Sequence, residues 1–155
     1  MKIELGCGRH HEHGWTTVDI SPYVGADVVA DMVEYVRTLD EDSVDVFRAI
    51  HSIEHLTEAQ VPGLLEEVRR ALVPGGRFVI ETPDLEAAAR EIAKDPDGRV
   101  AGLMAHRLMR DGDHKTAWTY GLLRKIAVVA RYSKCEKSQA KHHRPRYDMR
   151  VTLTA

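Results

Sequence analysis

A short strand pattern that runs straight into a glycine turn dominates the start of this sequence. Residues 2–5, KIEL, alternate polar and apolar side chains and lead into Gly-Cys-Gly at residues 6–8. A second β-prone run, residues 15–18, ends on Asp19. Glycines let the backbone turn sharply and approach a ligand where a Cβ would block it. A carboxylate after the second strand can accept both hydrogen bonds of a ribose diol, so the pattern predicts a nucleoside site in an α/β domain.

The segment ELGCG at residues 4–8 resembles the first motif of class I S-adenosylmethionine-dependent methyltransferases, and Asp19 resembles their ribose-binding acid. A dinucleotide-binding fingerprint would instead need G-x-G-x-x-G and an acid about twenty residues further on. Here the third glycine position is His11, and Asp19 comes sooner. The pattern therefore favours a methyl donor over a nicotinamide cofactor.

Two further stretches carry the same resemblance. Residues 64–80, LLEEVRRALVPGGRFVI, resemble the helix–PGG–strand signature of the family, and residues 51–56, HSIEHL, resemble its H-x-x-E-H-L pattern. The resemblance covers residues 2–90. It implies a Rossmann-like three-layer αβα sandwich with a seven-stranded, mostly parallel sheet. The last strand is expected to be antiparallel and to lie beside the fifth.

Apolar periodicity and turn residues predict the elements. Strands are expected at residues 2–5, 15–18, 27–30, 43–50, 77–82, 132–139 and 148–154. Helices are expected at residues 32–39, 57–72, 84–94, 97–109 and 121–130. Three details are specific. Pro62 loosens the first turn of the helix at residues 57–72, and residues 74–76 (PGG) end that helix. Asp95-Pro96 begins the helix expected at residues 97–109. On the helix that Asp84 caps, Leu85, Ala88, Ala89 and Ile92 are expected to be buried.

Length and composition favour a single domain spanning residues 1–155. Within it, residues 95–120 are expected to form a lid or a substrate-facing insertion, because the family varies most there. No apolar run is long enough to span a membrane, and the N-terminus enters a strand without room for a signal peptide. Two cysteines, Cys7 and Cys135, make no disulfide framework. The expectation is a cytoplasmic protein.

Charge is distributed unevenly along the chain. Residues 1–100 carry 20 acidic and 10 basic side chains, whereas residues 101–155 carry 4 and 12. An acidic first part suits a cationic sulfonium cofactor. The basic second part is consistent with attraction of a carboxylate, phosphate or nucleic acid, and equally with an ordinary solvated surface.

The resemblance also implies which residues contact S-adenosyl-L-methionine. Asp31 is expected to accept from the adenine amino group while Met32 covers the ring, and Asp31 is equally suited to cap the following helix. The expected cofactor-binding set is Glu4, Gly6, Cys7, Gly8, Asp19, Ile20, Asp31, Met32, Ile50 and His51.

His51 is the candidate catalytic residue, as a general base at the end of the fourth strand. The alternative is that His51 shapes the methyl pocket by packing and hydrogen bonding. Methyl transfer is an in-line displacement that depends mainly on alignment, so no metal or nucleophile is required. The histidine-rich runs lack the usual zinc-ligand spacing, and no metal site is predicted. These runs are His10, His11, His13, His142 and His143.

The leading functional hypothesis is a methyltransferase for a small-molecule or sugar-like acceptor, methylated on oxygen or nitrogen. A degenerate cofactor-binding or interaction module without turnover is the second hypothesis, because the glycine loop is altered. A nucleic-acid methyltransferase is the third, although no N-P-P-Y-like tetrapeptide follows the fourth strand. The expected partner is a small-molecule acceptor, and an anionic acceptor is one option. A second copy of the chain is another option, and no membrane is expected as a partner.

Overall fold

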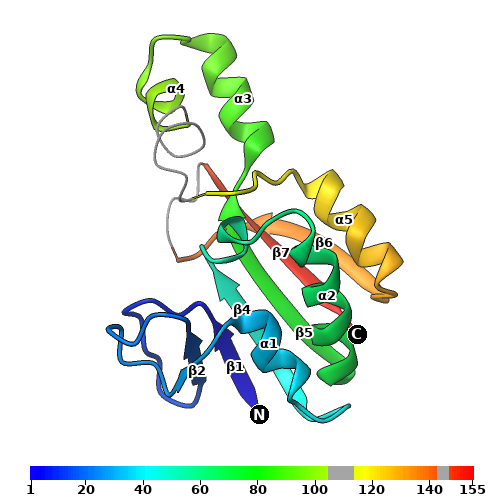
Figure 1. The fold of residues 1–155 in the computed structure, drawn as a ribbon. Helices are drawn as coiled ribbons and strands as arrows, with labels where there is room; N and C mark the ends of the chain where they lie inside the picture. Colours follow the sequence, from blue (N-terminus) through cyan, green and yellow to red (C-terminus); the bar gives the residue numbers. More distant parts are fainter. Residues whose placement is uncertain (105–113, 143–146) are drawn as a thin grey trace.

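Seven strands join into one sheet in the order β3-β2-β1-β4-β5-β7-β6 in the computed structural model, which describes residues 1–104, 114–142 and 147–155 (Figure 1). The pairs from β3 through β5 are parallel, and β7 is antiparallel to both β5 and β6. The strands are β1 (Lys2–Leu5), β2 (Thr16–Asp19), β3 (Val28–Val29), β4 (Val44–Ile50), β5 (Leu72–Pro83), β6 (Lys134–Gln139) and β7 (Asp148–Thr154). The expected sheet, with its antiparallel last strand beside the fifth, is confirmed.

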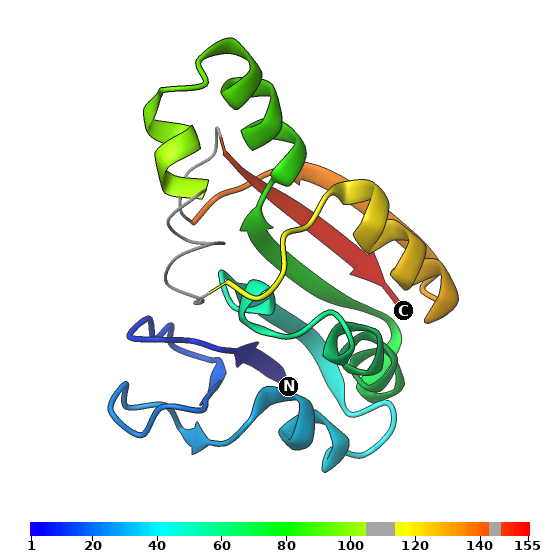
Figure 2. The ribbon, with the colours of Figure 1, turned by 45° about the horizontal axis from the view of Figure 1, so that its top comes forward.

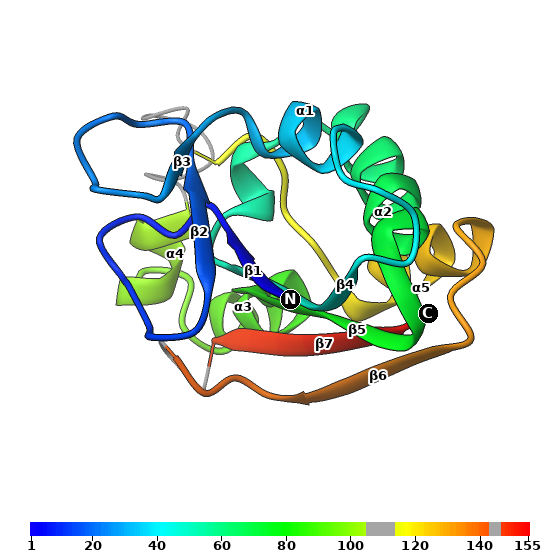
Figure 3. The same cartoon turned by 90° about the horizontal axis from the view of Figure 1, so that it is seen from below.

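The helices follow the strands in an alternating pattern. They are α1 (Met32–Arg37), the 3-10 turn η1 (Ile53–His55), α2 (Gln60–Ala71), α3 (Leu85–Lys94), α4 (Arg99–Met104) and α5 (Tyr120–Val129). α1, α2 and α5 lie on one side of the sheet (Figure 3), whereas α3 and α4 pack together beyond the ends of the strands (Figure 2). None of the helices in the described ranges is long and apolar enough to cross a membrane.

The core lies between the sheet and these three helices. Alternation along each strand turns apolar side chains toward the helices, as in β1, where Ile3 and Leu5 are fully buried. Phe47 of β4 and Phe78 of β5 are paired across the two strands. Their rings meet edge to face, with ring centroids 6.3 Å apart. The apolar stripe of α2 completes this layer with buried Val61, Leu64, Leu65 and Val68.

The opposite face of the sheet is polar and is covered by loops. Glu4, Arg48 and Glu81 are buried there. The connections from β1 to β2 and from β2 to β3 contain no helix. The physical reason is chain length, because residues 6–15 and 20–27 connect β1 to β2 and β2 to β3, and a helical crossover usually needs a dozen residues or more.

The start of α2 differs from the prediction. The helix begins at Gln60, not residue 57, so Pro62 is its third residue. The first N–H groups of a helix have no intrahelical acceptor, and proline costs nothing there. Gln60 contacts Thr57, because its Oε1 accepts from the backbone N–H and from the hydroxyl of Thr57, both at 2.9 Å.

The Pro-Gly-Gly segment at residues 74–76 also differs from the prediction, because it lies in a strand. α2 ends at Ala71, and the next residue, Leu72, is already extended and begins β5. Residues 74–76 thus lie within the strand span rather than ending the helix. The register between β4 and β5 shifts at this point, between Val44 and Val46, and Gly75 has a φ of 78°. The segment is an irregularity in β5 that a glycine makes possible.

Two predictions after β5 need correction. Asp84 does cap α3, since its Oδ1 accepts from the N–H groups of Glu86 and Ala87. However, Ala89 is exposed, and Asp95 ends α3 instead of beginning the next helix, which starts at Arg99. The remainder of the helix expected at residues 97–109 lies outside the described residues.

Core packing around β4 gives a stability prediction. Phe47→Ala removes a fully buried ring in contact with Phe78 and should lower the free energy of unfolding by about 3–5 kcal/mol. Val129→Ala, at a side chain that is 73% exposed, is the matched control and should change it by about 0.5 kcal/mol or less. Urea denaturation followed by circular dichroism measures both. Equal losses in the two variants would contradict this placement of the core.

Candidate active site

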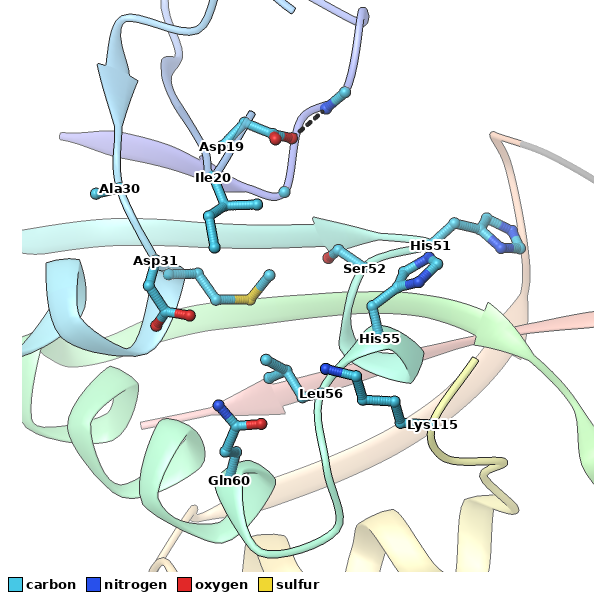
Figure 4. Close-up of a pocket in the computed structure, with 13 residues that line it drawn as sticks. Asp19, Ile20, Ala30, Asp31, His51, Ser52, His55, Leu56, Gln60 and Lys115 are labelled. Atoms are coloured by element: carbon cyan, nitrogen blue, oxygen red, sulfur yellow. Dashed lines mark hydrogen bonds between the residues drawn. The ribbon is translucent and has the colours of Figure 1, made fainter. Parts of the chain in front are cut away.

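A cavity of about 540 Å³ opens at the carboxyl ends of β1, β2 and β4 (Figure 4). Parallel α/β sheets bind their ligands at this edge. Most of the residues expected to bind the cofactor line the cavity, namely Gly6, Gly8, Asp19, Ile20, Asp31, Met32 and His51. Ala30, Ser52, His55, Leu56, Gln60 and Lys115 complete the lining.

The glycine turn closes the end of β1. Gly6 and Gly8 have φ angles of 68° and 55°, a region that side chains disfavour. The Gly6 N–H donates to the carbonyl of Val18 at 2.8 Å, which ties the turn to β2. A Cβ on Gly6 would lie 2.4 Å from the Cβ of Ser52, so this position accepts only glycine.

Asp19 closes the turn from the other side. Its Oδ2 accepts from the N–H of Gly8 at 2.8 Å, and its Oδ1 accepts from the N–H of Ser21 at 2.9 Å. The carboxylate is thereby fixed at the end of β2, facing the cavity (Figure 4). A carboxylate has about four acceptor directions, so a ribose diol can still be bound.

Asp31 caps α1 and also lines the cavity. Its Oδ1 accepts from the N–H groups of Val33 and Glu34 at 2.8 and 3.2 Å, which confirms the helix cap. The residue also lines the cavity beside Met32, whose methyl group lies near Gly6. The capping role therefore leaves Asp31 in position to meet a ligand.

Three expected cofactor residues do not line the cavity. Glu4 points to the polar face of the sheet, because its neighbours in β1 point to the helical face. Cys7 is buried, and its burial, with the charges of Asp19 and Glu4, raises the pKa of its thiol. Ile50 is half-buried at the end of β4. Cys7 contributes to the turn through its backbone N–H, which donates to the carbonyl of Val18 at 3.2 Å, and through its thiol, which donates to the carbonyl of Gly8 at 3.3 Å.

A buried arginine holds the glycine loop on the sheet. Arg48 of β4 donates to Glu4 of β1 at 2.6 Å and to Glu12 of the loop at 2.5 Å. Its guanidinium also lies 4.0 Å from the ring centroid of Trp15. Hydrogen bonding to Arg48 holds the pKa of the Glu12 carboxyl below its usual range. These contacts replace the helix that commonly joins the first two strands.

His51 is held between two carboxylates. One ring nitrogen, Nδ1, lies 3.1 Å from Oε1 of Glu54, and the other, Nε2, lies 3.1 Å from Oδ2 of Asp148. Burial alone would lower the pKa of the imidazole, but the hydrogen bonds to Asp148 and Glu54 outweigh it and raise the pKa to about 9. In this arrangement both nitrogens are protonated near neutral pH and donate. A general base requires the neutral ring.

Several lining residues could not be found from the sequence. Lys115 belongs to the segment that begins at residue 114. The N–H groups of Lys115 and Thr116 in this segment donate to the carbonyl of Glu54 at 2.8 and 3.1 Å. Asp148, whose carboxylate contacts His51, is the first residue of β7 and lies 97 positions after His51 in the sequence. Only the 51–56 motif gave a signal for this part of the site, through Glu54 and His55.

The His51 ion pairs predict a pH dependence of stability in metal-free protein. Because the folded pKa is above that of an unfolded histidine, the contribution is complete below about pH 6.5 and is lost as the pH rises through 9. Its upper bound is roughly 3 kcal/mol. Urea denaturation across this range should show the loss in the wild type and a flatter profile in His51→Gln. Identical profiles would contradict the pairing.

Comparison with known proteins agrees with this geometry. The family model described as methyltransferase domain matches residues 3–80, half of the chain. A methyltransferase structure from Archaeoglobus fulgidus, described as SAM-dependent, is similar over 99% of this chain and 85% of its own, at 17% identity and a TM-score of 0.71. A phosphoethanolamine N-methyltransferase from Haemonchus contortus in complex with S-adenosyl-L-methionine is similar over 99% of this chain and 48% of its own, at 13% identity and a TM-score of 0.65.

Among curated proteins, a segment is 31% identical over 105 residues to ATP synthase subunit delta of Streptomyces avermitilis, covering 68% of this chain and 37% of that protein. The chain spans about a third of the length of the curated relatives it matches, so their functions are not transferred to it. The family match extends from β1 through most of β5, the part that builds the cavity. The fold expected from the sequence is thus confirmed, and the chain belongs to the methyltransferase domain family.

Proposed function

We propose that this chain transfers a methyl group from S-adenosylmethionine to an oxygen or nitrogen of a small-molecule acceptor. The observation that carries the proposal is the convergence of Gly6, Asp19 and Asp31 on one cavity at the ends of β1, β2 and β3. Each comes from a different strand end, and each offers a different contact to an adenosyl group. An ordinary structural role for all three would not require them to face the same space.

In this proposal the donor occupies the side of the cavity formed by β1, β2 and α1. The turn at Gly6 leaves room for the nucleoside, while Asp19 accepts from the ribose hydroxyls. Asp31 accepts from the adenine amino group, and Met32 lies against the ring. Carboxylates on this side also suit the positive charge of the sulfonium.

The acceptor occupies the opposite side, beside His51, His55 and Lys115. A cavity of about 540 Å³ is typical for a small ligand, and it must hold the donor together with the reacting end of the acceptor. The Nζ of Lys115 has no ion-pair partner among residues 1–104, 114–142 and 147–155. An acceptor with a carboxylate or phosphate group would supply that partner. The end of the expected 95–120 insertion thus contributes to the acceptor side.

His51 is the residue we assign to the chemistry, at the junction of the two sides. Its backbone has a φ of 50°, and its N–H donates to the carbonyl of Glu81 at 2.8 Å, which fixes the ring position. A positioned ring can align the acceptor, which is the largest contribution that methyl transfer requires. Proton removal by His51 would additionally require the neutral ring.

A second reading is a module that binds the cofactor without turnover. The observation that favours it is that both ring nitrogens of His51, the residue assigned to the chemistry, already lie 3.1 Å from carboxylate oxygens of Glu54 and Asp148. Calorimetry with S-adenosylmethionine, followed by a screen of acceptors for donor consumption, separates the readings. Binding with methylated product supports the enzyme, whereas binding without product from any acceptor supports the module. No binding by folded protein would refute both.

The donor site gives a direct prediction. Asp19→Ala should weaken the binding of S-adenosylmethionine by about 1–3 kcal/mol, or roughly 5-fold to 150-fold, because a charged hydrogen-bond acceptor is lost. Asp40→Asn, at an exposed acid outside the cavity, is the control and should bind like the wild type. Isothermal titration calorimetry measures both. An unchanged affinity in Asp19→Ala would remove this residue from the site.

For His51 the expected effect is on turnover rather than on donor affinity. His51→Gln should lower kcat by roughly a hundredfold or more, the scale of a lost acid–base or aligning group, while the Kd for the donor changes little. The control is His13→Gln, in the exposed part of the glycine loop. A parallel loss of donor affinity and kcat would make His51 a binding residue instead.

A further inference from the structure

Glu54, His55 and His114 form a cluster at the edge of the cavity, outside the donor site. Each offers one ligand atom, and these atoms all lie within 4.8 Å of one another. The two imidazole rings meet edge to face, with centroids 5.0 Å apart. We propose that this cluster binds a divalent cation of the zinc type.

The backbone holds the two halves of the cluster together. Glu54 and His55 belong to η1, whereas His114 lies 59 positions later, beside Lys115 and Thr116. The N–H groups of Lys115 and Thr116 both donate to the carbonyl of Glu54. The segment is also attached further along, where the N–H of Leu85 donates to the carbonyl of Trp118 at 2.9 Å. His114 is therefore placed next to His55 by main-chain contacts, independently of its own side chain.

The Glu54 carboxylate is arranged like a metal ligand. It is 1% exposed, its Oε2 accepts from the Thr82 hydroxyl at 3.0 Å, and its Oε1 lies 3.1 Å from Nδ1 of His51. Ligating carboxylates are typically oriented by such outer hydrogen bonds. Two carboxylate oxygens offer about four acceptor directions, so these contacts leave directions for a cation.

The donor set indicates the class of metal. Two imidazoles and a carboxylate suit zinc and related transition metals, whereas magnesium and calcium prefer oxygen ligands throughout. Three protein ligands leave coordination positions for water or for a ligand oxygen. His55 also lines the cavity, so an open position can face the acceptor. That use of the metal rests on the proposed methyl transfer, but metal binding itself does not.

This site differs from the expectation drawn from the sequence. No metal site was predicted, because the histidine-rich runs at residues 10–13 and 142–143 lack suitable spacing. The cluster uses neither run. It joins His55 of the H-x-x-E-H-L motif to a histidine that no local spacing connects with it, and folding alone brings the two together.

The test is metal titration of metal-free protein without S-adenosylmethionine. Cobalt(II), which takes zinc sites and absorbs visible light, is titrated into wild type, His55→Gln, His114→Gln and His13→Gln, and zinc binding is measured by calorimetry. We expect one equivalent to bind, with at least tenfold weaker affinity in the first two variants. His13→Gln should match the wild type, and circular dichroism should show that all four proteins are folded.

Three outcomes would overturn the proposal. The wild type could show no cobalt spectrum and no zinc heat, or His55→Gln and His114→Gln could bind as tightly as the wild type. Alternatively, His10→Gln or His142→Gln, whose parent rings lie 6.4 Å apart elsewhere, could abolish binding instead. Because no donor is present, these results do not depend on whether the chain methylates anything.

Discussion

The carboxylate of Asp19 is the contact on which the proposed donor site depends. It accepts from Gly8 on one side and from Ser21 on the other, and so joins the turn after β1 to the end of β2. The turn itself requires glycine, because a Cβ on Gly6 would collide with Ser52. The backbone conformation of the glycine turn, the strand order and the Asp19 carboxylate thus together form the cavity at the carboxyl edge of the sheet. The chemistry assigned to the protein uses that edge.

The polar face of the sheet holds a buried ion-pair network. With no helix between β1 and β2, Arg48 joins β4, β1 and the glycine loop through Glu4 and Glu12. Removing one partner of a buried ion pair typically costs about 3–5 kcal/mol, because the remaining charge stays buried. The same network therefore stabilises the sheet and positions the loop. A substitution of Arg48 would therefore be expected both to lower stability and to displace the glycine loop.

Sequence pattern predicted the sheet well, and seven of the ten residues expected to bind the cofactor line one cavity. Alternating strands, the glycine turn and Asp19 are local features, so neighbouring residues suffice to recognise them. By contrast, Lys115 reaches the cavity and Asp148 reaches His51 through long-range folding that no local pattern records. No helix was expected at residues 6–15 or 20–27, which are too few for a usual helical crossover, and none forms there.

The most direct measurement is a crystal structure of the protein with S-adenosylhomocysteine, the product of the donor. The account predicts the adenosyl group in the cavity, with its ribose hydroxyls within hydrogen-bond distance of Asp19 and its adenine beside Asp31. An empty cavity at saturating ligand, or a nucleoside bound elsewhere on the chain, would contradict it.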